Sequence, residues 1–448
     1  MWRFMAPAGG SCRESGNSLM IIDHHHWYHH IILRLWSWVL ITICVWIVCQ
    51  CAEIVEDSRP KMVVESNDLV QPSLCASIIQ GNGYPCEEIT VQTRDGFLLG
   101  LQHIPYGSSG MKPFKNKRAV YLQHGVLQAG DDWVLNSPTE SLAFILADQG
   151  FDVWIGNVRG TTWSHGHITL TPESAKFWDW SFDEHAKFDL TALVGYVYNA
   201  TGDQIYYVGH SQGTMIALAA FTMAETGMTN MVKAAVLLSP IAYLQHTTSQ
   251  LVQAAAYYML DKLHQLHRLV ANSDFFNCIS CLCLSTQVHG SIALLMGVNI
   301  LAGPDCCFNQ TRYGYYLTWE PQPTSTKNMQ HLSQMVRGSN FSMFDYGTYG
   351  NLKAYNQTTP PLYELGKIPT AFPMLLCSGG QDALADPQDV KRLLSELKSD
   401  VITLYLANYA HADFVVGTRA NLDVYPVIIA YFQTFETTSF EGGHVTML

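Results

Sequence analysis

The chain has 448 residues, of which 48% are hydrophobic and 14% are charged; a chain of this length and composition can bury a large core, which excludes disorder as its dominant state. Asp and Glu outnumber Lys and Arg by 37 to 25, which gives a net charge of -12. This acidic balance provides no general attraction to phosphate backbones, so nucleic acid is not expected as a partner.

The first predicted element is an apolar segment at residues 35–52, which contains no charged side chain in 18 positions. It is longer than the roughly 7–15 apolar residues of a signal peptide and shorter than the roughly 20 that span a bilayer. We interpret residues 1–52 as a leader with an ER-targeting signal, which is either cleaved or kept as a membrane anchor. The expected destination is the secretory pathway, with secretion or a vacuolar or lysosomal lumen as its end point.

Two further patterns favour this compartment. Eight of the 12 cysteines lie beyond residue 60, and an oxidising lumen permits disulfides among them. The chain after the apolar segment also contains acceptor sequences N-x-[ST] for N-glycosylation. They lie at Asn199, Asn309, Asn340 and Asn356.

The cysteine spacing allows a short disulfide near the start of the folded region. Cys75 and Cys86 can close a loop there, whereas the pairing of the five cysteines from Cys278 to Cys307 stays open. Cys278 and Cys281 form a C-x-x-C pair, but no second pair or nearby His pair of matching spacing completes a zinc site. We therefore expect no metal at these cysteines.

Predicted strands and helices alternate along most of the chain, which is typical of a mostly parallel sheet covered by helices on both faces. A hairpin over residues 88–101 turns at an Asp-Gly pair. One helix is expected to begin with Ser137 as N-cap, Pro138 at its first position and Glu140 closing a capping box. Further strands are predicted at 119–123, 151–156, 205–208, 234–238, 374–378 and 401–406, and further helices at 189–198, at 215–225, from 387 onward and at 425–435.

The alternation of strands and helices fails over about 130 residues before the last two predicted strands. This length exceeds what a crossover between two parallel strands needs. The stretch contains two apolar runs, at residues 251–270 and 292–302, and five of the 12 cysteines. We therefore predict an α/β core formed by residues 53–241 and 370–448, interrupted by a mainly helical cap or lid at residues 242–369.

The chemistry begins with Gly209-His210-Ser211-Gln212-Gly213, which lies between a predicted buried strand and a predicted helix. A serine on such a sharp strand-to-helix turn is exposed to substrate, and both flanking positions must be small because strand and helix nearly touch. Gly209 and Gly213 meet that steric need. Ser211 is therefore the predicted nucleophile.

A serine hydroxyl needs a histidine base, and that base needs a carboxylate to orient it. After an elbow of this type the acid comes first in the chain and the histidine second, each just past a strand. Asp382 and His411 meet these conditions. Asp386 competes for the role of the acid, but it precedes a proline and is better explained as a helix N-cap.

An oxyanion hole requires two backbone N–H groups near the serine. Gln212 provides one because it begins the helix after the nucleophile. Val126 provides the other because it follows a predicted strand and His124-Gly125. We expect His124 itself to support this loop rather than to transfer protons.

Several segments of the chain are similar to the acid lipase family, which includes gastric and lysosomal acid lipases. The similarity runs from about residue 75 to residue 435, and residues 74–102 are typical of the plant triacylglycerol lipase branch. The extended N-terminus and the cysteines of the cap depart from the family pattern. The segments that carry the resemblance are residues 122–136, 152–167, 177–190, 209–214, 379–390 and 408–415.

The resemblance implies an α/β-hydrolase core, a cap with a movable lid, and no metal or organic cofactor. It also implies the amides of Gln212 and Val126 as oxyanion hole. In the family the acid precedes the histidine by 29 positions, which is the distance from Asp382 to His411. The family pattern thus favours Asp382 over Asp386.

These observations lead to the hypothesis of a serine ester hydrolase that releases fatty acids from triacylglycerols through an acyl-enzyme. The expected partner is a neutral lipid at a lipid-water interface, with membrane anchoring through the N-terminal apolar segment as a further hypothesis. Two alternatives stay open: a steryl-ester hydrolase, and a non-catalytic α/β-hydrolase fold that serves as a lipid or hormone receptor. An intact Ser-Asp-His set argues against the receptor.

Overall fold

The computed structural model of the chain describes residues 73–110, 118–258 and 298–436. All of them belong to one compact unit, Arg59–Leu448. The predicted leader lies outside the described residues, as do Cys278, Cys281 and Cys283 and most of both apolar runs. None of the helices in the described ranges is long and apolar enough to cross a membrane.

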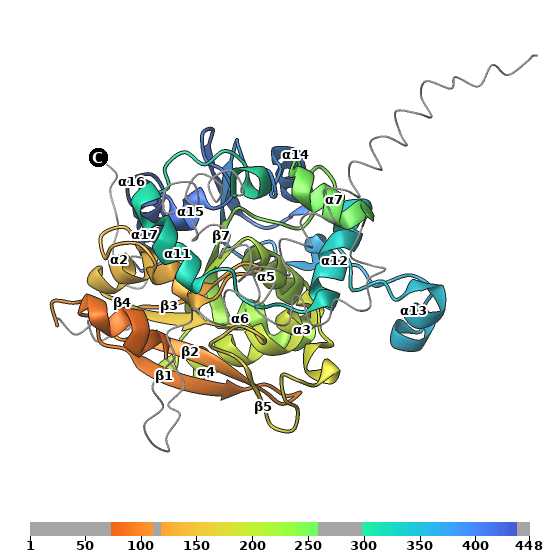
Figure 1. Cartoon of the computed structure of the whole chain (residues 1–448), viewed down its shortest axis with the longest axis horizontal. Helices are drawn as coiled ribbons and strands as arrows, with labels where there is room; N and C mark the ends of the chain where they lie inside the picture. The colour runs from red at the N-terminus through yellow and green to blue at the C-terminus, as the bar shows by residue number, and fades with distance from the viewer. Residues whose placement is uncertain (1–72, 111–117, 259–297, 437–448) are drawn as a thin grey trace, which may run out of the picture. The chain divides into compact units, whose positions relative to one another are not determined.

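The described residues form a nine-stranded sheet (Figure 1). Eight strands follow the order β1-β2-β4-β3-β6-β7-β8-β9, and β5 pairs with β2. The three pairs that involve β2 are antiparallel, and the pairs from β4 to β9 are parallel. The strands are β1 Glu87–Gln92, β2 Phe97–Ile104, β3 Arg118–Gln123, β4 Phe151–Gly156, β5 Gly166–His167, β6 Ile205–His210, β7 Val232–Leu238, β8 Met374–Gly379 and β9 Val401–Leu406.

Helices cover both faces of this sheet, as predicted. Successive residues of β3 belong to different apolar clusters: Tyr121 packs in the cluster that contains α4 and α5, and Leu122 in the cluster that contains α2 and α17. Side chains alternate across a strand, so these clusters occupy opposite faces. The helices are α2 Leu142–Asp148, α3 Phe182–Glu184, α4 Leu190–Thr201, α5 Gln212–Thr222, α6 Met228–Met231, α7 Gln250–Tyr258, α11 Tyr313–Trp319, α12 Thr326–Arg337, α13 Gly347–Tyr355, α14 Pro387–Glu396, α15 Asp413–Val416, α16 Ala420–Asp423 and α17 Tyr425–Thr434.

The predicted start of the helix before β4 is wrong. Helix α2 begins at Leu142, and the preceding residues form a turn in which the Glu140 N–H donates to the Ser137 carbonyl. The Ser137 hydroxyl donates to the Glu140 carboxylate at 2.8 Å. A capping box would instead need the Ser137 oxygen to accept a backbone N–H. Two residues of the predicted pattern therefore bond to each other rather than to the helix.

The hairpin and the short disulfide near the N-terminal edge of the sheet are confirmed. Strands β1 and β2 pair from Glu87 to Gln92, and Gly96 in the turn between them has a φ of 98°. Cys75 is bonded to Cys86. The disulfide joins the segment before β1 to the start of the sheet.

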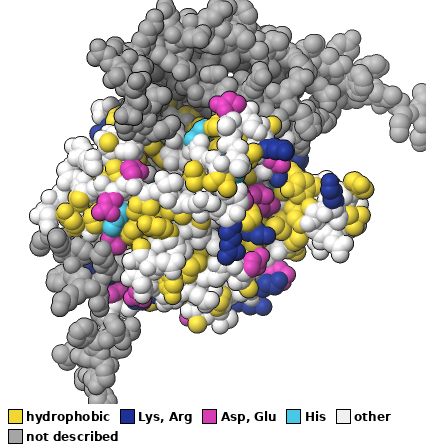
Figure 2. Space-filling view, turned by 90° about the horizontal axis from the view of Figure 1, so that it is seen from below, with side chains coloured by type: hydrophobic (Ala, Val, Ile, Leu, Met, Phe, Trp, Pro, Cys, Tyr) yellow, Lys and Arg dark blue, Asp and Glu magenta, His cyan; other side chains and the backbone are white. Residues whose placement is uncertain are grey.

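The segment between β7 and β8 interrupts the alternation of strands and helices, as expected. Its described residues contain α7, α11, α12 and α13. Helix α12 packs against α7, and α13 stands apart from the sheet (Figure 1). On the face drawn in Figure 2, basic side chains of the described residues lie among acidic and hydrophobic ones, so these residues form no wide area of positive charge there. The cap boundaries at residues 242 and 369 stay a prediction.

Candidate active site

Ser211 lies on a sharp turn between β6 and α5. Its backbone has φ 53° and ψ -121°, a conformation that costs a residue with a side chain about 1–3 kcal/mol. The Ser211 N–H donates to the Leu238 carbonyl at 3.0 Å, which ties the turn to the end of the neighbouring strand β7. The surrounding fold thus holds the serine at the carboxyl end of the sheet in the strained geometry of a nucleophile elbow.

Gly213 lies where α5 passes over the end of β3, and it provides a direct test of this packing. A Cβ at Gly213 would lie 2.5 Å from the Gln123 carbonyl oxygen and 2.8 Å from the His124 carbonyl oxygen. Because both obstacles are backbone atoms, Gly213→Ala should lower the free energy of unfolding by about 1–3 kcal/mol. Gly81→Ala is the matched control, since a Cβ there meets no atom within 4 Å. Equal melting temperatures for the two variants would contradict the close contact.

Asp382 and His411 follow the ends of β8 and β9. The His411 Nδ1 lies 2.9 Å from Asp382 Oδ1 and 3.0 Å from Oδ2. Backbone N–H groups of Leu384 and Ala385 also donate to Asp382 Oδ1, at 2.9 and 2.8 Å. Burial by itself raises the pKa of Asp382, but the attraction and hydrogen bond of His411 outweigh it and leave this pKa below its ordinary value. The carboxylate is therefore ionised and orients the imidazole.

The second nitrogen of His411 is free to act as a base. Its Nε2 is buried and has no hydrogen-bond partner among the described residues. The residue before Ser211, His210, places its Nε2 2.9 Å from the His411 carbonyl oxygen, so the turn at Ser211 and the loop of His411 are in contact. No hydrogen bond joins Ser211 Oγ to His411 Nε2 in the described residues; such contacts are often long before substrate binds.

The loop after β3 lies directly against the serine. A Cβ on Gly125 would come within 2.9 Å of Ser211 Cβ. The N–H groups of Val126 and Gln212 donate to no group within the described part of the chain. Two unpaired donors beside a serine are what an oxyanion hole needs.

His124 supports this loop, as predicted. Its Nδ1 lies 2.8 Å from the Gly125 carbonyl oxygen, and its Nε2 accepts the Val158 N–H at 3.2 Å. Burial lowers the pKa of His124 to about 4, so the ring is neutral near neutral pH and can donate one bond while accepting the other. The ring links the loop to the strand end at β4.

Asp386 is the N-cap of α14. Its Oδ1 accepts the Gln388 N–H at 2.8 Å, and Pro387 occupies the first turn of the helix. The interpretation of this residue as a cap is thereby confirmed. Its carboxylate is engaged at the helix end rather than with His411.

The sequence interpretation missed a group of three carboxyls next to the loop after β3. Asp131 and Asp132 lie in the helical turn Gly130–Val134, and Glu320 Oε1 accepts the Ala129 N–H at 3.2 Å. Burial raises the pKa of Asp131 to about 7. Burial also raises the pKa of Asp132 and of Glu320, and the neighbouring acids add to the effect. Two adjacent acids within an otherwise apolar segment were the signal available in the sequence.

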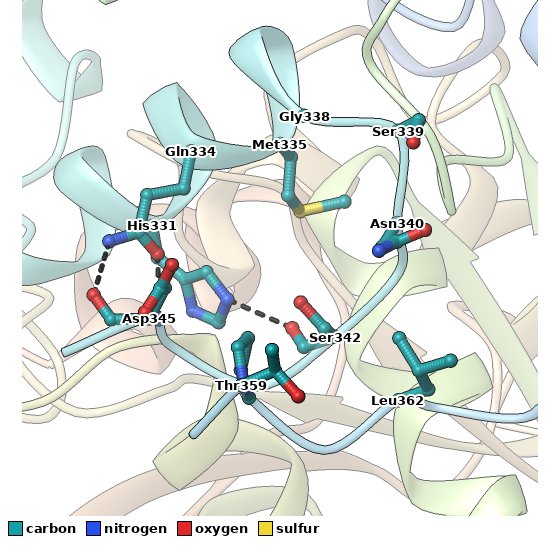
Figure 3. Close-up of a pocket in the computed structure, with 11 residues that line it drawn as sticks. His331, Gln334, Met335, Gly338, Ser339, Asn340, Ser342, Asp345, Thr359 and Leu362 are labelled. Carbon is teal, nitrogen blue, oxygen red and sulfur yellow. Dashed lines mark hydrogen bonds between the residues drawn. The ribbon is translucent and has the colours of Figure 1, made fainter. Parts of the chain in front are cut away.

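A pocket of about 400 Å³ lies in the segment between β7 and β8 (Figure 3). His331 and Gln334 of α12 line it together with Asn340, one of the predicted glycosylation sites. His331 Nε2 lies 3.0 Å from the Ser342 carbonyl oxygen, and the Gln334 amide bonds with the backbone of Asp345. None of the three predicted catalytic residues lines this pocket, so it is distinct from the predicted catalytic site.

One group of side chains among the described residues has ligand atoms close enough for a metal. Cys306, Cys307 and Asp413 each place an atom within 4.8 Å of the others. The two cysteines are bonded to each other, so neither offers a thiolate. The Asp413 carboxylate accepts the backbone N–H groups of Ala410 and Cys306. It therefore holds the loop that contains His411.

Two family models match the chain. One, described as a partial alpha/beta-hydrolase lipase region, matches residues 75–137, and the other, described as alpha/beta hydrolase fold, matches residues 118–418. Triacylglycerol lipase 1 of Arabidopsis thaliana is 43% identical over 81% of this chain and 90% of its own length. Gastric triacylglycerol lipase of Rattus norvegicus is 36% identical over 78% of this chain and 88% of its own length.

Solved structures of low sequence identity also resemble the chain. A putative lipase from Acinetobacter baumannii has a TM-score of 0.47 and 15% identity, and covers 83% of this chain and 99% of that one. A soluble variant of monoglyceride lipase from Saccharomyces cerevisiae has a TM-score of 0.46 and 15% identity, and covers 78% and 96%.

Proposed function

We propose, from the premise that this chain belongs to the acid lipase family of α/β-hydrolases, that it hydrolyses triacylglycerols with Ser211 as nucleophile. Membership makes the chain a carboxylic ester hydrolase. The relatives named triacylglycerol lipases support acylglycerols as the substrate class. The observation that carries the proposal is the strained serine whose neighbour His210 contacts His411, a histidine with its Nδ1 bonded to a buried carboxylate.

In the proposed reaction His411 Nε2 takes the proton from Ser211 Oγ as that oxygen attacks the ester carbonyl. The Asp382 carboxylate stabilises the imidazolium that forms, and the amides of Val126 and Gln212 hold the negative oxygen of the tetrahedral intermediate. The imidazolium then protonates the leaving alcohol, which leaves an acyl-enzyme. Water activated by His411 attacks the acyl-enzyme, releases the fatty acid and restores Ser211.

The cap between residues 242 and 369 is the proposed cover of the acyl-binding groove. A lipase must hide an apolar groove in water and expose it at a lipid surface, which a movable lid achieves. The described helices α7 and α12 belong to this segment. The position of the segment in the chain, between β7 and the strand that precedes Asp382, supports its placement near the catalytic residues.

The test is hydrolysis of a matched panel by the full chain: triolein, a phospholipid, a steryl oleate and a short soluble ester, each from acidic to mildly alkaline pH. We expect triolein to be the best of the three long-chain substrates. Faster hydrolysis of the steryl oleate would favour the steryl-ester alternative. A receptor would hydrolyse none of them and would not react with a serine-directed phosphonate.

We further propose that the chain enters the secretory pathway and carries N-glycans, either as a soluble luminal protein or anchored by its N-terminal segment. The disulfide between Cys75 and Cys86 supports an oxidising compartment. Three of the four acceptor asparagines are exposed, and Asn309 is half-buried with its side chain capping a short helix. The exposed acceptors are Asn199, Asn340 and Asn356.

The protein should be produced in a eukaryotic host and treated with an endoglycosidase. We expect this treatment to lower its mass, because exposed acceptor asparagines are available to the enzyme that attaches N-glycans. Replacing Asn199, Asn340 and Asn356 together by Gln is the control, and it should remove most of the shift. Unshifted wild-type protein recovered from the cytosol would contradict the secretory assignment.

A further inference from the structure

Gln128 lies in the loop after β3, two residues beyond the proposed oxyanion donor Val126, and its side-chain amide is fixed from both ends. Its Oε1 accepts the Gly125 N–H at 3.0 Å. Its Nε2 donates to Asp132 Oδ2 at 2.7 Å. The Gly125 N–H can only donate to the amide oxygen, which leaves the amide nitrogen facing Asp132, so the amide has one orientation.

The amide oxygen lies close to the nucleophile. A Cβ on Gly125 would come within 2.3 Å of Gln128 Oε1 and within 2.9 Å of Ser211 Cβ. Both the Gln128 amide oxygen and the serine therefore lie on the side of Gly125 to which a Cβ would point. The next peptide N–H in the chain belongs to Val126, so a displacement of Gly125 changes the direction of that donor.

His210 extends the contact to the triad. Its Nε2 carries the hydrogen, because the His411 carbonyl oxygen 2.9 Å away can only accept. Burial lowers the pKa of His210 to about 3, so the ring is neutral and its Nδ1 holds a lone pair. That nitrogen lies 3.2 Å from Gln128 Oε1, where two acceptors face each other. His210 therefore contacts the amide without holding it, and Gly125 and Asp132 are the groups that fix Gln128.

We propose that Gln128 is a positioning residue that aims the Val126 N–H at the developing oxyanion by clamping Gly125 against Ser211. The inference rests on the proposed function and adds a specific residue to it. Gln128 touches no reacting atom; it acts through the backbone of the loop. The carboxyl of Asp132 anchors the far end of the clamp.

Gln128→Leu keeps the side-chain size and removes both hydrogen bonds. Loss of a whole oxyanion donor costs about 100–1,000-fold in kcat, so a misdirected donor should cost about 10–100-fold. We expect this loss in kcat on a short soluble ester, with KM changed by less than about twofold. The affinity for a boronic acid that forms a tetrahedral adduct on Ser211 should fall by the same factor, because only the tetrahedral state uses the oxyanion hole.

Gln128→Glu is isosteric and makes the clamp depend on pH. A protonated Glu accepts the Gly125 N–H and donates to Asp132, whereas once this Glu and Asp132 have both lost their protons the two carboxylates repel each other. The other titratable groups around this side chain are Asp131, Glu320, His210 and His411. We expect the ratio of variant to wild-type kcat to be near one at acidic pH and to fall as the pH rises. A purely structural role would leave that ratio constant.

Gln322→Leu is the matched control. Its amide also donates to the carboxyl cluster, at 3.3 Å from Asp131 Oδ2, but it does not contact Gly125. We expect a lower melting temperature with kcat and boronate affinity retained.

Wild-type kcat and boronate affinity in Gln128→Leu, or a pH-independent ratio in Gln128→Glu, would overturn the inference. If the Leu variant does not fold, the Glu variant decides. Failure of the proposed function would show differently, as wild-type protein in which a phosphonate does not label Ser211.

Discussion

Ser211→Ala is expected to lower kcat for ester hydrolysis on the order of a million-fold and to abolish labelling by a serine-directed phosphonate. The reason is chemical, since the variant lacks the oxygen that forms the acyl-enzyme. The fold should persist, because Ser and Ala both have a Cβ and meet the positive φ of 53° at similar cost. The measurements are kcat on a soluble ester, mass spectrometry after labelling, and the melting temperature.

Ser333→Ala is the control for removing a buried hydroxyl elsewhere. Ser333 lies in α12, and its Oγ donates to the Met329 carbonyl at 2.9 Å. This variant should keep its activity and its labelling. Wild-type activity in folded Ser211→Ala protein would rule out the serine mechanism.

Asp382→Asn is expected to lower kcat about 10,000-fold while leaving the loop intact. The amide oxygen can still accept the N–H groups of Leu384 and Ala385. The amide nitrogen would then donate to His411 Nδ1, which forces the ring hydrogen onto Nε2. A protonated Nε2 on a neutral ring cannot take the proton from Ser211.

Asp386→Asn is the matched control, four residues further along the chain. Asn caps a helix about as well as Asp, so α14 and the activity should both be kept. The kcat values of the two variants on the soluble ester decide the assignment. A larger loss in Asp386→Asn than in Asp382→Asn would identify Asp386 as the acid.

The sheet could be predicted because its strands have local signals. Strands β4 and β6 are buried along their whole length, and their sequences are short apolar runs bounded by turn residues. The start of α2 could not be predicted in the same way. Ser137 and Glu140 have the spacing of a capping box, but in the fold they bond to each other in a turn and α2 begins at Leu142, which the local pattern does not reveal.

In the candidate site too, some residues could be predicted from the sequence and others could not. Ser211, Asp382 and His411 each follow a strand of the parallel sheet, and parallel strands bring such positions to one edge. The contact between Ala129 and Glu320 joins residues 191 positions apart across the core and the cap segment. The two residues share no periodicity in the sequence, so only the folded chain reveals the cluster of three carboxyls next to the loop after β3.

The carboxyls of Asp131, Asp132 and Glu320 make the free energy of unfolding depend on pH. Their pKa values are raised in the folded chain, to about 7 for Asp131. At a pH between the ordinary carboxyl pKa and about 7, the folded state therefore binds more protons than the unfolded state. Unfolding in this range releases protons, and the free energy of unfolding therefore falls as the pH rises. An acidic lumen would thus strengthen the junction at which Glu320 meets the backbone of Ala129, and neutral surroundings would weaken it.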